Sequence, residues 1–175
     1  MNVVIKRRVA AHNIDALNRA VVATVDLENG SIFTLSARSE NEAEGEVWKA
    51  TQPTVGAKNV WMAKSSEVTI TTIGADTGAD VLQMKGIVED PRMFTNVKGL
   101  VFDAFKPQVA DIIEMTLGDD EKEYLVADAS YTLKADTAAG DGFAMHKVGT
   151  SILHIGSAKL VKTPVKTYIY EVVAN

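Results

Sequence analysis

Hydrophobic and polar residues alternate along much of this chain, and the clearest alternation lies in residues 21–37. Two apolar runs there, VVATVDL and SIFTLSA, are separated by Glu28-Asn29-Gly30. An Asn-Gly step between such runs is a strong hairpin signal. A three-residue loop with a left-handed Gly30 pairs Val25 with Phe33, and this register collects the apolar side chains on one face. The pattern predicts a half-buried hairpin, with Ala23 opposite Leu35 and Val21 opposite Ala37.

Further strand patterns recur at the spacing of about 8 to 12 residues that is typical of β-sandwiches and barrels. They cover residues 46–50, 59–63, 68–73, 81–88, 97–106, 108–117, 124–126, 131–134, 143–155 and 165–173. One short helix is expected, with Asn13 as its cap and Ile14, Leu17 and Val21 on a shared face. We therefore expect a mainly β fold, either a sandwich or a partly open barrel with hairpins. Residues 1–19 form an N-terminal arm with a possible short helix, and residues 20–175 form a single β-rich domain.

Several strands carry more specific expectations. Residues 46–50 and 59–63 are expected to pair, with Trp48 and Trp61 as core anchors. Residues 124–126 and 131–134 are expected to form a second short pair. In residues 108–117, which follow Pro107, alternation places Ile113, Met115 and Leu117 on one face and Glu114 and Thr116 on the other. Gly149 interrupts the strand over residues 143–155.

The first eight residues combine an apolar stretch, Val3-Val4-Ile5, with a basic one, Lys6-Arg7-Arg8. One interpretation is an edge strand whose charges face solvent, because charged residues protect sheet edges from aggregation. The other is a projecting arm that docks on a partner, since chain termini are ordered only where something holds them. In the second interpretation, removing the arm leaves the body folded.

Composition narrows the class of protein further. The chain has 175 residues, 46% of them hydrophobic, which favours one packed domain. No apolar run approaches the ~20 residues of a membrane span, and residues 1–8 have the wrong order of charge and apolarity for a secretory signal. There is no cysteine, and the net charge is −5. Because phosphate neutralisation needs a concentrated basic face, we expect no nucleic-acid partner.

The sharpest catalytic candidate is Asp76, in the motif Asp-Thr-Gly-Ala-Asp over residues 76–80. Retroviral-type aspartic proteases have this motif at their catalytic aspartate, where two subunits each contribute a loop and share a proton. Here Gly74-Ala75 precede Asp76 in place of the bulky apolar residues of those enzymes, and no Gly-rich flap is evident. Asp, Thr and Gly are also ordinary turn residues. A turn is the favoured interpretation, with the protease as an alternative.

Other catalytic and metal patterns are weaker. His12, His146 and His154 have no second histidine at the spacing of a metal site. No G-x-S-x-G motif singles out a nucleophilic serine, and Gly140-Asp141-Gly142 lacks the Lys of a phosphate loop. We expect no catalytic residue, no metal and no cofactor, and hence no enzyme.

Residues 90–116, DPRMFTNVKGLVFDAFKPQVADIIEMT, resemble small structural proteins of tailed bacteriophages that are regarded as head decoration, or cement, proteins. The opening VIKRRVAAHNIDALNRAVVAT and the later EVWKAT are similar to the same group. Ala110 departs from the pattern, because a glycine is expected before Asp111 in a tight turn.

The resemblance implies a non-enzymatic virion protein that binds the outside of the capsid and stabilises the shell. It implies the major capsid protein as partner, a homo-oligomer on the capsid surface, and a location in the host cytoplasm during assembly. A tail-tube or tail-completion protein is the alternative within the same setting. The candidates for capsid interaction are Val3, Val4, Ile5, Lys6, Arg7 and Arg8.

Overall fold

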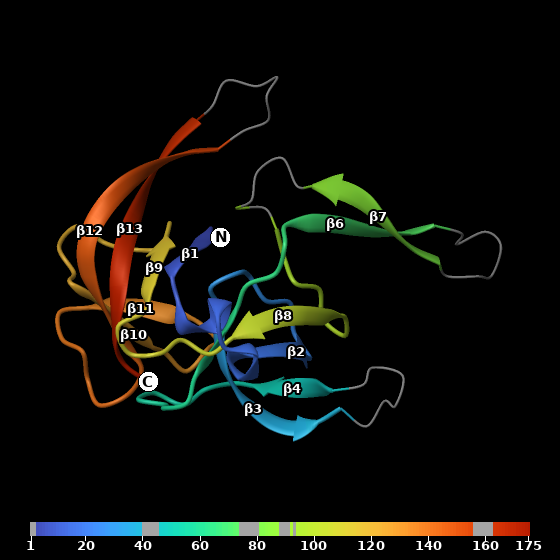
Figure 1. The fold of residues 1–175 in the computed structure, drawn as a ribbon, viewed down its shortest axis with the longest axis horizontal. Helices are drawn as coiled ribbons and strands as arrows, with labels where there is room; N and C mark the ends of the chain where they lie inside the picture. The colour runs from blue at the N-terminus through green and yellow to red at the C-terminus, as the bar shows by residue number, and fades with distance from the viewer. Residues whose placement is uncertain (1–2, 40–45, 74–80, 88–91, 93, 156–162) are drawn as a thin grey trace.

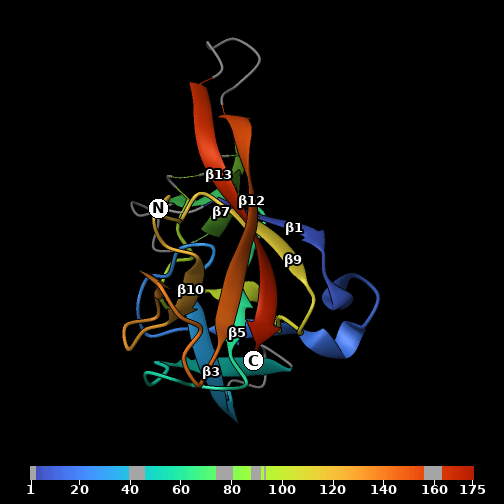
Figure 2. The ribbon, with the colours of Figure 1, turned by 90° about the vertical axis from the view of Figure 1, so that its left-hand side faces the viewer.

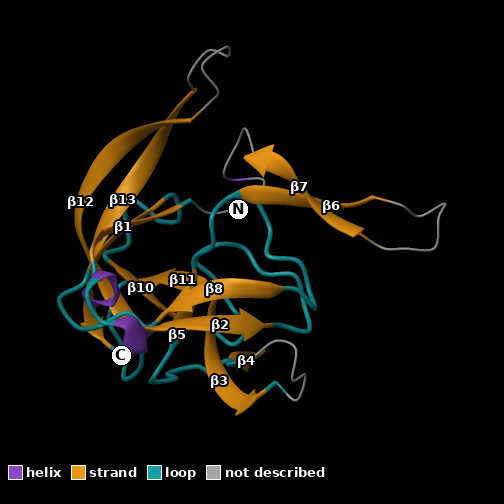
Figure 3. Cartoon of the chain, turned by 45° about the vertical axis from the view of Figure 1, so that its right-hand side comes forward, coloured by secondary structure: helices purple, strands orange, loops and turns teal. Residues whose placement is uncertain are grey.

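The structure is a computed structural model that describes residues 3–39, 46–73, 81–87, 92, 94–155 and 163–175. These residues form three sheets, and helix is confined to short turns (Figure 3). The prediction of a mainly β sandwich or barrel is confirmed, because one sheet is a closed barrel and another packs against it.

Six antiparallel strands form the larger sheet, in the order β1-β9-β13-β12-β10-β11. Their bounds are β1 Val4–Arg8, β9 Ile112–Met115, β10 Tyr124–Ala127, β11 Leu133–Asp136, β12 Ala144–Ile155 and β13 Thr163–Ala174. The two longest strands, β12 and β13, extend past their neighbours as a curved hairpin (Figure 1, Figure 2). Strands β1 and β11 are the edges of this sheet.

Five shorter strands close into a barrel in the order β2-β4-β3-β5-β8. Their bounds are β2 Asn18–Val22, β3 Ile32–Arg38, β4 Val47–Thr51, β5 Trp61–Ala63 and β8 Val101–Phe105. β2 pairs in parallel with β4 and antiparallel with β8, and this second pairing closes the ring.

Two apolar clusters follow from this arrangement. One fills the barrel and includes Val21, Phe33 and Phe102, whose two phenyl rings meet edge to face with centroids 5.8 Å apart. The other lies between barrel and sheet and joins Ile32 and other barrel residues to Met115 of β9. Because Ile32 and Phe33 are neighbours in β3 with opposite faces, β3 serves both clusters. The barrel and the sheet therefore share one wall.

The third sheet is a hairpin of two strands, β6 Val68–Ile73 and β7 Val81–Ile87. Within the described chain it pairs with no strand of the barrel or the larger sheet. It reaches out to one side of the molecule (Figure 1). Both strands were expected from the sequence.

The predicted hairpin of residues 21–37 is wrong in its pairing. β2 and β3 are not neighbours, because β4 lies between them and pairs with both. The chain between them leaves the barrel and forms a bridge from Leu27 to Asn96. Gly30 does take a positive φ of 88°, in a turn where the Ser31 N–H donates to the Glu28 carbonyl over 3.1 Å. The turn was predicted correctly, but β2 and β3 pair with other strands of the barrel and not with each other.

The N-terminal segment also differs from the prediction of a projecting arm. β1 is extended, but it pairs with β9 as the edge strand of the larger sheet, so it belongs to the body. The predicted helix is replaced by two single-turn 3-10 helices, Ala10–His12 and Asp15–Leu17. Asn13 follows the first of these as its C-cap and caps neither at the N-terminus.

The tryptophan strands are present as β4 and β5, but they do not pair with each other, because β3 lies between them. Trp61 is buried as predicted, whereas Trp48 is half-buried and lies under the Arg38 guanidinium at 6.0 Å. Three local predictions are confirmed. β10 pairs with β11, β8 and β9 lie on either side of Pro107, and β12 has a register shift between Lys147 and Gly149.

Candidate functional site

The six N-terminal residues that were expected to contact a capsid lie in and beside β1, where they differ greatly in exposure. Val3 and Val4 are buried, Ile5 and Lys6 are half-buried, and Arg7 and Arg8 are exposed. The Val3 N–H donates to Thr116 Oγ1 over 2.9 Å, and Val4 pairs with Met115. Because the two valines pack in the interior, a partner can reach only the later residues of the strand.

Arg7 is held by a carboxylate within the sheet. Its Nε donates to Glu114 Oε2 over 2.6 Å, and the Thr167 hydroxyl donates to the other oxygen of the same carboxylate. The Glu114 side chain is only 2% exposed. A buried carboxylate is costly unless it is paired, so this network ties β1 to β9 and β13. The sequence correctly placed Glu114 opposite the apolar face, but alternation alone did not predict its burial.

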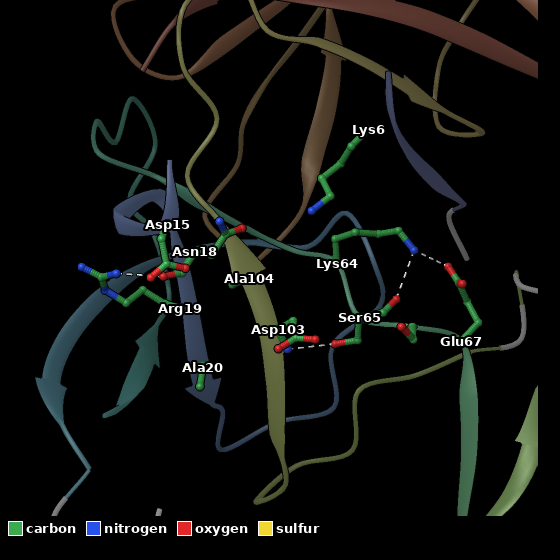
Figure 4. Close-up of a pocket in the computed structure, with 11 residues that line it drawn as sticks. Lys6, Asp15, Asn18, Arg19, Ala20, Lys64, Ser65, Glu67, Asp103 and Ala104 are labelled. Carbon is green, nitrogen blue, oxygen red and sulfur yellow. Dashed lines mark hydrogen bonds and ion pairs between the residues drawn. The ribbon is translucent and has the colours of Figure 1, made fainter. Parts of the chain in front are cut away.

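Lys6 points the other way, into a cleft of about 830 Å³ between β1 and the barrel (Figure 4). Four separate segments line this cleft: β1, residues 15–20, the loop after β5, and β8. The lining residues are Lys6, Asp15, Asn18, Arg19, Ala20, Lys64, Ser65, Ser66, Glu67, Asp103 and Ala104. They include three cationic and three carboxylate side chains, so the cleft is strongly polar and almost neutral overall.

Two of the cations already have partners in the protein. Lys64 Nζ lies 2.5 Å from Glu67 Oε1 and 3.1 Å from the Ser65 carbonyl oxygen. The Arg19 guanidinium lies 5.6 Å from the ring centroid of Trp61, within the range of a cation–π contact. These contacts hold both side chains in place at the rim of the cleft.

Lys6 has a different environment. Its ammonium lies 5.2 Å from the ring centroid of Phe105, and no acceptor among the described residues is within hydrogen-bonding distance. Burial lowers the pKa of Lys6, repulsion from Lys64 lowers it further, and attraction to Asp103 partly opposes both. Burial and the nearby Lys64 charge thus both disfavour the charged form of Lys6.

Asp103 completes the cleft from the barrel side. Its backbone N–H donates to Ser65 Oγ over 3.0 Å, and its carbonyl oxygen accepts from the Lys64 N–H over 3.0 Å. These bonds fix the loop after β5 against β8. The carboxylate itself has no hydrogen-bond donor within the described part of the chain, and it is exposed.

The six charged side chains of the cleft lining can form ion pairs with a bound group. The Ser65 hydroxyl oxygen accepts the Asp103 N–H. Sequence reasoning found Lys6 through its basic run, but it missed Arg19, Lys64 and Asp103, because no local motif links residues so far apart.

The remaining candidates from the sequence lie elsewhere. Asp76 and its motif fall outside the described residues, so the protease alternative is untested. His12 ends the first 3-10 helix, and His146 lies in β12 with its ring centroid 5.0 Å from that of Tyr124. Among the described residues, no group of three or more metal-ligating side chains gathers into a possible site. No described helix has the length and apolarity to cross a membrane.

Comparisons with protein-family models, with curated proteins and with solved structures found no match to this chain.

Proposed function

We propose that this protein is a non-enzymatic structural component of a tailed-phage virion that binds the outside of the capsid as a decoration protein. The major capsid protein is the proposed partner, with several copies of this chain acting together on the shell. The resemblance in residues 90–116 and in the opening residues motivates this choice. The architecture supports it through one feature, the detached hairpin β6–β7.

A two-stranded hairpin is marginally stable by itself in water, and a third strand or a covering layer is usually needed. β6–β7 pairs with neither of the other sheets in the described chain. Its register pairs Ile70 with Met84, Thr71 with Gln83 and Thr72 with Leu82. A hairpin that pairs with neither sheet of the described body suits a contact with a neighbouring subunit, because its strand edges can accept a further strand.

Many copies on one shell need only modest contacts. When one contact of a multivalent assembly forms, the next forms at a high effective concentration, so weak single interfaces still give stable attachment. A decoration protein therefore requires projecting contact elements and a stable body, and no active site. This chain offers both in β6–β7 and the body of barrel and sheet.

The test is a binding assay with undecorated capsids of the cognate phage. Purified protein is mixed with shells, the shells are sedimented, and bound copies are counted. Ile70→Glu replaces an apolar residue of β6 with a charge and should reduce binding about tenfold or more, because burying an unpaired charge in a contact is costly. Thr71→Glu adds the same charge at the neighbouring polar position and is the matched control. Failure of the intact protein to bind shells would refute decoration.

The open edges of the larger sheet favour a second candidate, a tail-tube or tail-completion protein. Among the described strands, β1 and β11 each pair on one side only, and strand addition at such edges can build rings of subunits. Negative-stain images of the concentrated protein separate the two proposals. Rings that stack without capsids support the tail protein, whereas knobs added to empty shells support decoration.

A further inference from the structure

The cleft beside β1 holds three charged groups, on Lys6, Asp15 and Asp103, for which the described protein supplies no direct partner. The Lys6 ammonium has no acceptor and the Asp103 carboxylate has no donor among the residues that the structure describes. Both lie in the same cleft, Lys6 from the sheet and Asp103 from the barrel (Figure 4). They attract each other through space without forming an ion pair. Lys6 and Asp103 therefore present one positive and one negative group to the cleft from opposite walls, held apart by the fold.

Among the strands that the structure describes, the β1 backbone beside this cleft is paired on one side only. β1 pairs with β9 on one side and is the edge of its sheet on the other. An edge strand presents unpaired N–H and C=O groups to any extended segment that approaches it. Three features thus coincide at β1: an open edge, a cleft of about 830 Å³ and a separated pair of opposite charges.

We infer that this cleft binds an extended peptide segment of a partner protein, which carries an acidic and a basic side chain on the same face. The segment adds to β1 as a strand, its acidic side chain pairs with Lys6, and its basic side chain pairs with Asp103. Alternate residues of a strand share a face and lie about 7 Å apart, so one short segment can supply both charges. Opposite charges in register also select against partners that carry only one sign.

The inference rests on the proposed function in one respect, because the segment is taken to belong to a shell subunit. A purely structural role for Lys6 is the competing explanation. In that case its side chain only covers the ring of Phe105, which is 1% exposed. Replacing Lys6 with methionine keeps an unbranched apolar stem over the ring and removes the charge, so this variant separates the two roles.

The probe is an acetylated and amidated octapeptide in which threonine alternates with glutamate and lysine. The comparison peptide has glutamine in place of both charged residues. Each is titrated into the full-length protein, and binding is followed by the amide NMR signals of β1. The charged peptide should bind with an affinity that falls about tenfold in Lys6→Met and in Asp103→Asn. Lys49→Gln removes one positive charge from exposed β4 surface, away from β1 and from the described lining of the cleft, and it should change the affinity less than about twofold.

Three results would overturn the inference: no binding of the charged peptide, equal binding of the two peptides, or equal loss in Lys6→Met and Lys49→Gln. The capsid assay is independent of the peptide assay. Shell binding without peptide binding removes the cleft from the mechanism and leaves decoration standing. Peptide binding without shell binding refutes decoration and keeps the cleft as a peptide site.

Discussion

The barrel and the larger sheet treat their strand edges in opposite ways. The ring β2-β4-β3-β5-β8 gives each of its strands two neighbours, so the barrel has no free edge. The larger sheet ends at β1 and at β11. Edge strands are where other chains can add, and proteins usually protect them with charges. The three consecutive basic residues of β1 fit that rule, and they also put the polar cleft and the open edge at one place.

The comparison separates two roles within one molecule. A closed barrel is suited to stability, because each of its strands has a neighbour on both sides within the chain. An open sheet can pair with a strand of another chain at its edges, and the same edges can also lead to aggregation. The shared wall at β3 couples the two, so a change at their junction should affect both. Five variants break or sharpen this comparison.

Deletion of residues 1–8 removes the open edge and should have the largest effect. It strips the buried Val4 from the core and leaves the buried Glu114 carboxylate without Arg7. We expect a loss of unfolding free energy on the order of 4 kcal/mol or more, from lost apolar burial and an unpaired buried charge. Urea denaturation followed by far-UV circular dichroism measures it. A truncated protein with an unchanged midpoint would restore the projecting-arm interpretation.

Gly142→Ala tests the contact between the larger sheet and the barrel, where Gly142, just before β12, lies against the loop between β4 and β5. An added Cβ would lie 2.3 Å from the carbonyl carbon of Gly56, in the loop between β4 and β5. Because backbone must move, we expect a cost of about 3 kcal/mol. Gly140→Ala is the control, since Gly140 has φ +67° and open space around it. Strain alone should cost about 1 kcal/mol there. Equal losses in the two variants, measured by chemical denaturation, would contradict the junction contact.

Gly30→Val tests the barrel side alone. Gly30 has φ 88°, and its N–H donates to the Ala63 carbonyl over 2.8 Å. A β-branched residue resists positive φ, so the free energy of unfolding should fall by about 1 to 2 kcal/mol. Gly30→Asn should lose less, because asparagine tolerates this conformation. A thermal melt of the three proteins checks the order, and an unaltered melting temperature in the valine variant would count against the turn.

Ala110→Gly should stabilise the protein. Ala110 has φ 73°, and its N–H donates to the Val172 carbonyl over 2.8 Å, in the connection between β8 and β9. Glycine relieves the strain of a positive φ, by about 1 kcal/mol. The neighbouring substitution Val109→Gly should destabilise the protein. Val109 is not one of the described residues with a positive φ, so glycine relieves no strain there and only adds freedom to the unfolded chain. Opposite signs in urea denaturation support the strained turn; a loss in both would disprove it.

Asp76→Asn should have no measurable effect, because we interpret Asp76 as a turn residue. Melting temperature and shell binding are expected to match those of the unaltered protein. The protein should also show no pepstatin-sensitive peptide cleavage at acidic pH. Cleavage that disappears in Asp76→Asn would establish the protease alternative, in which two chains share one proton between their aspartates.

The sequence predicted where the strands lie better than it predicted which strands pair with each other. β10 and β11 lie six residues apart in the chain, and their pairing was correct because a short connection leaves few alternatives. The Asn29-Gly30 step also produced its turn, but β4 was inserted between the flanking strands. Local turn chemistry cannot register a strand that arrives later in the chain. For the same reason the sequence prediction paired β4 with β5, whereas in the structure both pair with β3.

The candidate site was predictable only in part. The basic run of β1 drew attention to Lys6, since three adjacent charges after an apolar stretch are visible in the sequence. Asp103 and Lys64 gave no such signal, because one alternates as an ordinary solvent-facing strand residue and the other lies in a loop. The cleft exists because β8 joins the barrel while β9 pairs with β1, and that arrangement depends on long-range packing.

The pairing of β1 with β9 also means that β1 is synthesised well before the strand with which it pairs. Arg7 and Glu114 are 107 positions apart. At about 5 to 20 residues per second, translation supplies β9 roughly 5 to 20 s after β1. Throughout that interval an apolar strand of the nascent chain lacks its partner, and its positive charges help keep it from associating with other chains. Topologies rich in such distant pairings also fold slowly after release, so expression at reduced temperature should raise the soluble yield.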